Sequence, residues 1–467
     1  MNKQLQQSVT TQFDNKKVVI LGIGITGLSC ARFLHKHQVI FSVNDSRATP
    51  ISPGDFSQQF AGNTLVLGQW DSQLIAQADV LIVSPGIDIS DPAISDAITA
   101  TCDVIGDVEL YCRLTNTPIL AVTGSNGKST VVSLLNHVGN ALGYKVQLGG
   151  NIGLPVLDQI DQSNSAATDF MVLELSSFQL ETIKSMSPLS ATVLNVSDDH
   201  LDRHKTIENY AAIKQGIYHH CTTAIYNRDD NATKPINVAG NCTQISFGND
   251  KPSAGNFGIA KVANELQLMF GDTALIALKK LPLQGIHNAL NYLAVLALGT
   301  GAGWNLSAMV SNLLNFKGLA HRCEVIESQD GIRWVNDSKA TNVGATLAAI
   351  EGLAPTLYDN KLILIAGGEG KGADFTPLTK AITEQVAYLI TLGKNGREIA
   401  DLRLESQQDK TQHVDSLEDA VALARVYATS NDMVLLSPAC ASLDMFANYV
   451  ERGVVFIQSV LSHKELN

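Results

Sequence analysis

Short apolar runs that end in glycine or small polar residues recur along the whole chain. Three of them lead into a glycine-rich loop and span residues 17–27, 118–128 and 361–371. Five others have the same β-rich composition and span residues 78–84, 169–176, 190–197, 387–393 and 432–438. Runs of this length without a polar face are typical of strands that are buried on both sides, as in parallel sheets. We therefore expect a buried strand in each run.

The apolar positions between these runs recur at helical spacing instead. Residues 130–142 are the clearest case, because Val131, Leu134 and Val138 fall on one face and Gly143 follows as a stop signal. Strands that alternate with such helices predict an α/β fold with helices on both sides of parallel sheets. The three glycine loops divide the chain into three α/β domains, which we expect at residues 1–115, 116–318 and 319–467.

The composition is that of a folded protein, with 45% hydrophobic and 17% charged residues among 467. The net charge of -12 disfavours nucleic acid as a partner, because such a surface repels phosphate backbones. A small anionic substrate stays possible, since local basic groups can outweigh the overall charge. The sequence therefore points toward small-molecule chemistry.

The cysteines and the N-terminal residues indicate where the protein works. Seven cysteines are scattered without a CxxC pair, which argues against a disulfide framework and a structural zinc site. The first 19 residues are polar and lack the apolar core of a signal peptide. No apolar run reaches the roughly 18 residues that span a bilayer. We expect a soluble cytoplasmic protein that does not insert into membranes.

The first glycine loop, Gly22–Gly27, has the spacing GxGxxG between a predicted strand and a predicted helix. Its glycines allow a tight turn and let backbone N–H groups approach a diphosphate at the helix N-terminus. Asp45 follows roughly 20 residues further on, where an acidic residue can accept a ribose hydroxyl. The motif predicts a nucleotide diphosphate and does not choose between NAD and a UDP-sugar. A glycine turn that serves only packing is the alternative.

The second glycine loop, TGSNGKST at residues 123–130, resembles a P-loop. Its backbone N–H groups would cradle phosphate oxygens, Lys128 would neutralise the β- and γ-phosphates, and the hydroxyl of Ser129 would bind Mg²⁺. The loop is a variant, because Val122 stands where the strict pattern has glycine. A strand before the loop and an amphipathic helix after it favour ATP binding over a chance match.

Carboxylates follow two further strands of the same domain. Glu174 lies near the end of the run 169–176, and Asp198, Asp199 and His200 follow the run 190–197. The carboxyl ends of parallel strands are where such folds bind ligands, so these groups suit Mg²⁺ held against ATP. His200 and His204 also have the spacing of a zinc pair, but no third ligand at a recognisable spacing accompanies them.

Three features were harder to interpret from residue types alone. Lys214 lies in a probable helix, and a surface lysine is the ordinary interpretation. The polar stretch 336–342 is compatible with turn chemistry as well as with a ligand site. Cys440, in the small-residue stretch 437–444, is better explained as a small buried thiol than as a nucleophile, since no partner is identifiable.

Taken together, these stretches resemble the Mur ligase family over essentially the whole chain. The motifs occur in the family's order and are TGSNGKST, LELSSFQLE, NVSDDHLDRH, GIHNALN, GLAHRCE and NDSKATN. The stretches GIGITGLSC, GGNIG and SPACASLDMF make the chain most similar to the branch that adds D-glutamate. The resemblance implies a Rossmann-like N-terminal domain that binds the UDP-sugar, a central P-loop ATPase-like domain, and a Rossmann-like C-terminal domain that binds the amino acid.

The resemblance also implies a reaction and its participants. ATP would phosphorylate the carboxylate of UDP-N-acetylmuramoyl-L-alanine, and the amine of D-glutamate would displace phosphate from the acyl phosphate. This is an amide-forming ligase step of peptidoglycan precursor synthesis, with ATP and two Mg²⁺ ions as cofactors and a monomer as the expected form. Phosphorylation makes chemical sense, because it gives a poor electrophile a leaving group.

Residue roles carry over by motif position. The implied catalytic residues are Lys128, Glu174, His200, Lys214 and Lys339. The implied ATP-binding residues are Gly124, Ser125, Asn126, Gly127, Lys128, Ser129, Thr130, Asn291, Arg322 and Asp337. The implied metal ligands are Ser129, Glu174, His200 and Lys214, the last as a carbamate formed with CO₂. The resemblance thus reverses the interpretation of Lys214 as a surface residue.

The two remaining sets belong to the outer domains. The residues implied to contact the UDP-substrate are Ile25, Thr26, Asp45, Ser46, Arg47, Gly86 and Asn151. Those implied to surround D-glutamate with Lys339 are Thr341, Lys371, Ser442, Leu443 and Tyr449. The family often has phenylalanine where Tyr449 stands.

Two other functions remain as alternatives. A nicotinamide dehydrogenase would explain the first glycine loop and Asp45 but would leave the other two loops unexplained. A non-enzymatic nucleotide switch would bind ATP without releasing phosphate in the presence of an acceptor. Folylpolyglutamate synthetases share the last two domains of the family but lack the first.

Overall fold

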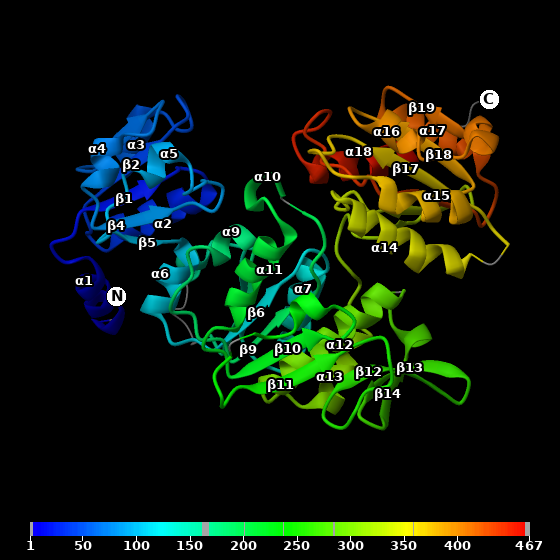
Figure 1. Ribbon diagram of the computed structural model, residues 1–467, viewed down its shortest axis with the longest axis horizontal. Helices are drawn as coiled ribbons and strands as arrows, with labels where there is room; N and C mark the ends of the chain where they lie inside the picture. Colours follow the sequence, from blue (N-terminus) through cyan, green and yellow to red (C-terminus); the bar gives the residue numbers. More distant parts are fainter. Residues whose placement is uncertain are drawn as a thin grey trace.

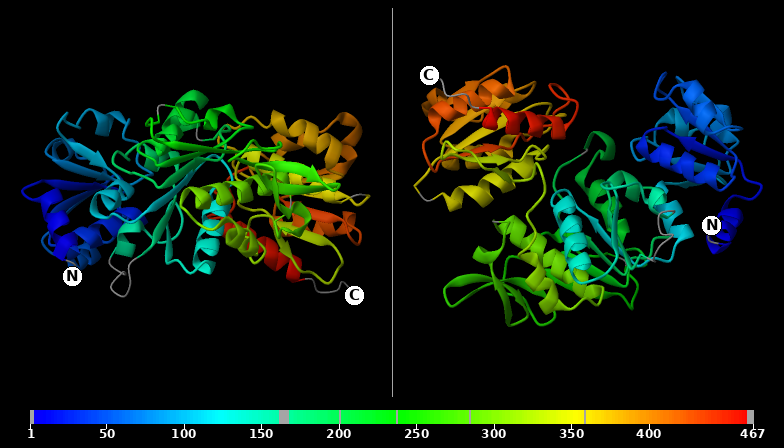
Figure 2. Two further views of the ribbon diagram at one scale, coloured as in Figure 1. Left: turned by 90° about the horizontal axis from the view of Figure 1, so that it is seen from below. Right: turned by 180° about the vertical axis from the view of Figure 1, so that it is seen from behind.

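The computed structural model describes residues 3–160, 168–199, 201–236, 238–283, 285–357 and 359–462. Three sheet-centred units follow one another along the chain (Figures 1 and 2). The strands expected from the apolar runs are all present, and the helix expected at 130–142 is α7 (Lys128–Ala141). The α/β fold class is therefore confirmed.

The first unit is a five-stranded parallel sheet in the order β3-β2-β1-β4-β5. Its strands are β1 (Val18–Leu21), β2 (Phe41–Asp45), β3 (Thr64–Leu67), β4 (Val80–Val83) and β5 (Asp103–Ile105). Its helices are α1 (Lys3–Phe13), α2 (Ile25–Lys36), α3 (Pro53–Gln59), α4 (Ser72–Ala76), α5 (Pro92–Ser95) and α6 (Asp107–Leu114). The central strands β1 and β4 are buried at every position, as their apolar sequences predict.

The second unit is a six-stranded parallel sheet in the order β11-β10-β9-β6-β8-β7. Its strands are β6 (Ile119–Thr123), β7 (Val146–Gly150), β8 (Phe170–Glu174), β9 (Ser190–Val193), β10 (Thr223–Asn227) and β11 (Thr243–Phe247). Its helices are α7, α8 (Val156–Ile160), α9 (Ser177–Leu180), α10 (Leu201–His204), α11 (Ile207–Gln215), α12 (Ile286–Gly301) and α13 (Leu306–Leu313). Since β8, β6 and β9 are neighbours, the residues that follow them meet at one edge of the sheet.

A small antiparallel sheet lies beside this unit. It consists of β12 (Phe257–Val262), β13 (Glu265–Phe270) and β14 (Thr273–Ala277). Helix α12, whose sequence is apolar almost all round, packs against α7, α13 and the strands β9 to β12. A helix without a polar face needs such cover on several sides.

The third unit is a six-stranded sheet in the order β15-β16-β20-β17-β18-β19, parallel except for β15. Its strands are β15 (Glu324–Ile326), β16 (Arg333–Asn336), β17 (Leu362–Gly367), β18 (Tyr388–Leu392), β19 (Thr411–His413) and β20 (Met433–Leu436). Its helices are α14 (Val343–Leu353), α15 (Thr379–Gln385), α16 (Gly396–Ala400), α17 (Leu417–Tyr427) and α18 (Tyr449–Leu461).

The apolar cores divide differently from the sheets. One continuous buried cluster runs from Phe33 of the first unit through Val108 of α6 to Leu157 and Leu173 of the second. The fully buried residues of the two clusters around the third sheet all come from residues 326–460. The first two units therefore share a core, whereas the third has its own. Among the described residues, no helix has the length and apolar character needed to cross a membrane.

Candidate active site

The second glycine loop turns directly from β6 into α7. Gly124 and Gly127 both have positive φ, +144° and +85°, a backbone conformation that side chains disfavour. A Cβ at Gly127 would lie 2.5 Å from Oδ1 of Asn291 on α12, so the close approach of this helix also requires glycine. Two hydrogen bonds with Asn195 hold the loop in place. The Asn126 N–H donates to Oδ1 of Asn195 at 2.8 Å, and Nδ2 of Asn195 donates to the Asn126 carbonyl at 3.1 Å.

Lys128 bends back over this loop. Its ammonium donates to the carbonyls of Gly124 and Ser125 at 2.7 and 2.8 Å. Burial lowers the pKa of the Lys128 ammonium, and the nearby Glu174 and Asp199 carboxylates oppose that effect. The cation is thus held over the loop whose backbone N–H groups would cradle a phosphate.

Glu174 ends β8 beside the loop and is 1% exposed. Asn151 donates to its Oε1 at 2.8 Å, while Oε2 has no hydrogen-bond partner among the described residues. Gly150 must be glycine here, because its φ is +95° and a Cβ would lie 2.2 Å from the Glu174 carbonyl oxygen. A buried carboxylate oxygen without a donor is the kind of group that a cation satisfies.

Lys214 lies on α11 beneath the loop, and the interpretation of this residue as a surface lysine is wrong. It is 1% exposed, and its Nζ lies 3.1 Å from the Gly124 carbonyl oxygen and 4.3 Å from the ring centre of Tyr210. Burial first, and then the Lys128 charge, hold the pKa of the Lys214 ammonium well below its usual value. Sequence periodicity could not show this, because the loop that covers Lys214 comes from a distant part of the chain.

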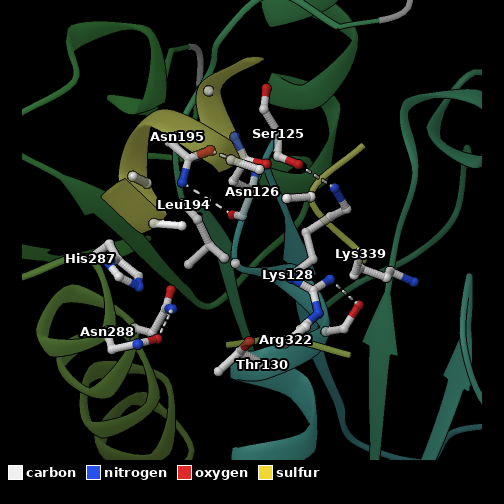
Figure 3. A pocket seen from close by; sticks show the side chains of 18 of the residues that line it. Ser125, Asn126, Lys128, Thr130, Leu194, Asn195, His287, Asn288, Arg322 and Lys339 are labelled. Atoms are coloured by element: carbon white, nitrogen blue, oxygen red, sulfur yellow. Dashed lines mark hydrogen bonds between the residues drawn. The ribbon is translucent and has the colours of Figure 1, made fainter. Parts of the chain in front are cut away.

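Side chains of the third unit reach across to this loop. Arg322 donates to Oγ of Ser129 at 3.0 Å, and Asn342 donates to Oδ1 of Asn126 at 3.3 Å. Burial raises the pKa of the Asp337 carboxyl to about 6. The two units enclose a cavity of about 460 Å³ into which the loop, Glu174 and Lys339 all face. Figure 3 shows the cavity with Lys128, Arg322 and Lys339 among its labelled residues.

Lys339 is held by Tyr449, the first residue of α18. Its ammonium donates to the Tyr449 hydroxyl at 2.8 Å and lies 4.1 Å from the ring centre. The backbone is tied to the same residue, since Ser338 Oγ donates to the Tyr449 carbonyl at 2.8 Å. The hydroxyl therefore fixes the direction of Lys339, and a phenylalanine would keep only the contact with the ring.

We expect Tyr449→Phe to lower kcat/KM for the amino acid by about two- to fivefold, because one charge-assisted hydrogen bond to Lys339 is lost. Steady-state rates at varied amino acid concentration measure this effect. Tyr427→Phe is the matched control, since the Tyr427 ring stacks on Tyr388 on another side of the same domain. Equal rates for Tyr449→Phe and the wild type would show that the hydroxyl does not position Lys339.

The first glycine loop follows β1 in the other sheet. A Cβ at Gly27 would lie 1.9 Å from the Gly22 carbonyl oxygen, so α2 approaches the strand as closely as a diphosphate-binding loop requires. Asp45 is buried and accepts from the Ile23 N–H at 2.8 Å and from the Arg47 side chain at 2.6 Å. These hydrogen bonds lower the pKa of the Asp45 carboxyl although its burial opposes them. Asp45 thus holds the loop in shape, a role that the ribose-binding interpretation does not require.

The cavity brings together most residues expected at the ATP site. Those that line it are Ser125, Asn126, Gly127, Lys128, Ser129, Thr130, Asn291, Arg322 and Asp337, together with Glu174, Lys339 and Thr341. Asn151, expected at the UDP-substrate, also lines it. The cavity lining does not include Gly124 of the loop, Lys214 beneath the loop, or Lys371, Ser442, Leu443 and Tyr449 of the third unit. The others lie in the first unit: Ile25 and Thr26 begin α2, Asp45 ends β2, Ser46 and Arg47 follow β2, and Gly86 follows β4. His200 lies outside the described residues.

Some lining residues were not singled out from the sequence. Asn195 follows β9 and grips the loop, and Asn342 reaches it from the third unit. His287 and Asn288 line the cavity from α12 (Figure 3), and burial lowers the pKa of His287 to about 4. Asn195 could have been found from its position near the end of a predicted parallel strand, where such folds bind ligands. For α12, the signal was only the GIHNALN motif.

The zinc pair suggested by the spacing of His200 and His204 and the thiol of Cys440 are the two other chemistries that the sequence raised. His204 packs against Ser177 and Phe178, and no group of three His, Cys, Asp or Glu side chains within the described ranges could hold a metal. Cys440 is fully buried, and burial raises the pKa of its thiol to about 12, which agrees with a small buried thiol and not with a nucleophile.

Comparison with known proteins agrees with this geometry. Three family models match the chain: "Mur ligase MurD-like, N-terminal domain" at residues 16–106, "Mur ligase middle domain" at 122–299, and "Mur ligase, glutamate ligase domain" at 321–440. The chain belongs to the Mur ligase family, whose members are ligases.

Curated relatives are similar over nearly their whole length. The UDP-N-acetylmuramoylalanine--D-glutamate ligase of Colwellia psychrerythraea is 52% identical and covers 97% of this chain and 98% of its own. The protein of the same name from Legionella pneumophila is 41% identical and covers 95% and 98%. Among solved structures, MurF from Acinetobacter baumannii has a TM-score of 0.62 at 16% identity and covers 98% of both chains. At that identity the likeness concerns the fold alone.

Proposed function

We propose that this enzyme joins D-glutamate to UDP-N-acetylmuramoyl-L-alanine at the expense of ATP, through an acyl phosphate, in peptidoglycan precursor synthesis. The observation that carries the proposal is the single cavity in which Lys128 of the P-loop and Lys339 of the third domain both lie. A phosphate donor and an incoming amine must meet in such a place. The names of the similar relatives support the choice of substrates.

The ATP site combines the P-loop with residues of the third domain. Loop N–H groups and Lys128 would bind the β- and γ-phosphates, and Asn291 would face the nucleotide from α12. Arg322 and Asp337 would complete the site from the third domain. The Lys128 ammonium now donates to two loop carbonyls. When ATP binds, it would donate to phosphate oxygens instead, and these contacts would hold it in place during phosphoryl transfer.

The buried, unpartnered Oε2 of Glu174 fits a divalent cation at this site. We propose that Ser129 and Glu174 hold one Mg²⁺ and that His200 and the Lys214 carbamate hold a second. The ions would offset the charge that develops on the transferring phosphoryl group. Lys214 suits carbamylation because its lowered pKa supplies the neutral amine that reacts with CO₂.

We propose that residues 1–115 form the domain that binds the UDP-sugar, with the loop Gly22–Gly27 at the diphosphate. The N-terminus of α2 has no side-chain cap, so its N–H groups are available to an anion. The highly exposed Ile25 and the neighbouring Thr26 would contact the substrate, together with Ser46, Arg47 and Gly86. Asn151 contacts Glu174 in the cavity, so we place it where the precursor meets the metal.

We propose that residues 116–318 form the ATP-binding domain and residues 319–467 the amino-acid-binding domain. The residues around D-glutamate would be Lys339, Thr341, Lys371, Ser442, Leu443 and Tyr449. All proposed sites are built from one chain, so we propose an active monomer, and we place the reaction in the cytoplasm, where ATP is supplied.

We expect ADP release over many turnovers to require both UDP-N-acetylmuramoyl-L-alanine and D-glutamate, because phosphoryl transfer needs a positioned carboxylate and the amine must consume the acyl phosphate before the next turnover. A coupled ADP assay over a panel of UDP-precursors and amino acids measures this requirement. Equal turnover with L-glutamate or diaminopimelate would contradict the assignment. Tight NADH binding without ATP hydrolysis would instead favour a dehydrogenase, and ATP binding without phosphate release would favour a switch.

A further inference from the structure

We propose that Arg452 is a positioning residue for the amino acid substrate, because its buried guanidinium ties together the loops that carry the D-glutamate-binding side chains. This inference rests on the proposed function and adds to it a residue that touches none of the reacting atoms. The positive charge of Arg452 would also explain why the third domain binds an anionic amino acid.

Arg452 lies on α18 and is 2% exposed, although arginine is among the residues least often buried. Nε donates to Ser338 Oγ at 3.0 Å, and Nη2 donates to the Ser338 carbonyl at 2.8 Å. Nη2 also donates to the Cys440 carbonyl at 3.1 Å, and Nη1 donates to the Ala441 carbonyl at 3.3 Å. The four acceptors belong to two loops that are about 100 residues apart in sequence.

These loops carry the proposed amino acid site. The loop after β16 continues from Ser338 into Lys339 and Thr341, and the loop after β20 continues from Ala441 into Ser442 and Leu443. The glycine loop after β17 is the third loop that packs around Arg452. Gly368 has φ +129°, and a Cβ there would lie 2.3 Å from the Ala441 carbonyl oxygen and 3.3 Å from Nη1 of Arg452. The guanidinium therefore lies behind all three loops, including the one that bears Lys371.

The loop after β20 needs a partner of this kind. Ala439 has φ +58°, a left-handed conformation that costs free energy in a residue with a side chain. The next two carbonyls, those of Cys440 and Ala441, both accept from Arg452. The Ala441 carbonyl also accepts from the Glu369 N–H at 2.9 Å, so the Cys440 carbonyl is the one that depends on the guanidinium. A buried carbonyl without a donor would be costly, so Arg452 helps to keep this strained turn in one conformation.

Among the described residues Arg452 makes no ion pair, although the Asp444 and Asp337 carboxylates attract its charge from further away. Within the described part of the chain, no carboxylate comes within 4.0 Å of its guanidinium nitrogens. Burial lowers the pKa of Arg452 to about 10, while the Cys440, Asp444 and Asp337 side chains oppose this effect, so the group stays protonated at neutral pH. An unpaired cation behind the loops favours a ligand with two carboxylates.

A lysine could keep the charge but not the contacts. The guanidinium reaches four acceptors with one planar fork, whereas an ammonium has three donors at a single point. Arg452→Lys therefore separates loop positioning from charge, and Arg452→Gln removes both. Arg425→Lys is the matched control, because Arg425 is also mostly buried in the same domain but pairs with Asp330 and stacks on Trp334.

The test measures KM and kcat for D-glutamate, ATP and the UDP-precursor separately, on the full-length protein. We expect Arg452→Lys to raise KM for D-glutamate by about tenfold and Arg452→Gln by more, with KM for ATP and for the precursor within about twofold. Arg425→Lys should leave all three within about twofold. Equal changes in all three KM values, or the same D-glutamate effect in Arg425→Lys, would overturn the inference.

Two further measurements keep the outcome decisive. If the Arg452 variants do not fold by circular dichroism, Ser338→Ala serves instead, because it removes the Nε acceptor together with the hydroxyl that donates to the Tyr449 carbonyl. This variant should raise KM for D-glutamate by about threefold. An unchanged KM in that variant would overturn the inference. Wild-type protein that releases ADP over many turnovers without D-glutamate would instead contradict the proposed function itself. The two failures are therefore distinguishable.

Discussion

Lys128→Ala is expected to lower turnover by about 10²–10⁴-fold, the range found when an electrostatic contact to a transition state is removed. The ammonium lies over the P-loop and is held there by two carbonyls, so it is already placed where a bound phosphate would lie. Its effect should fall on phosphoryl transfer. Affinity for the UDP-precursor should stay near the wild-type value, because we propose that the UDP-sugar binds to the first domain.

Single-turnover ADP formation and equilibrium binding of the precursor measure the two quantities separately. Lys145→Ala serves as a matched control, since Lys145 is exposed in the same domain just after α7. Normal turnover of Lys128→Ala would refute the phosphate role. Loss of precursor affinity alone would place Lys128 at a different substrate.

Lys214→Ala is expected to abolish turnover almost completely, and Lys214→Glu, with a shorter reach, to recover at most a little. A free ammonium near Mg²⁺ would be repelled, whereas a carbamate supplies two oxygens that suit a hard cation. Because the pKa of Lys214 is lowered, the reactive neutral amine is present at a lower pH than for an ordinary lysine and becomes more abundant as pH rises. Activity should therefore depend on bicarbonate most strongly on the acidic side.

Turnover measured across pH with and without bicarbonate checks this expectation. A crystal grown with bicarbonate and Mg²⁺ should also show added density beyond Nζ, within reach of the second Mg²⁺ ion that we propose. Lys261→Ala, at an exposed strand position in the same domain, should behave as the wild type. Full activity of Lys214→Ala would make this lysine a structural residue only.

The parallel sheets could be predicted from the sequence because their strands are buried on both faces and their composition alone marks them. The loops could be predicted because glycines occur where a positive φ is needed, as at Gly124 and Gly127. The antiparallel sheet β12–β14 was not predicted, because its strands are half exposed and carry charged residues such as Lys261 and Glu265. Helix α1 was not predicted either, since only two of its residues, Val9 and Phe13, have buried apolar side chains.

The site could be predicted only in part, for a related reason. Residues within one motif, such as Lys128 and Ser129, share a short stretch of chain, and their chemistry follows from it. Contacts between motifs depend on which strands are neighbours. Asn151 meets Glu174 because β7 pairs with β8, and Lys214 is buried because α11 packs beneath the loop after β6. A lysine in an apparently ordinary helix gives no sign of such surroundings.

The core shared by the first two sheets has a mechanical consequence. Moving one of these sheets against the other would expose apolar surface from Phe33 to Leu173, so they resist relative displacement. The third sheet meets them at this site through polar contacts such as Arg322 with Ser129, which water can replace at little cost in free energy. We therefore expect the third sheet to move as one body relative to the first two, which would stay together. Such a movement would open the cavity, so that the amino acid can enter and the product can leave.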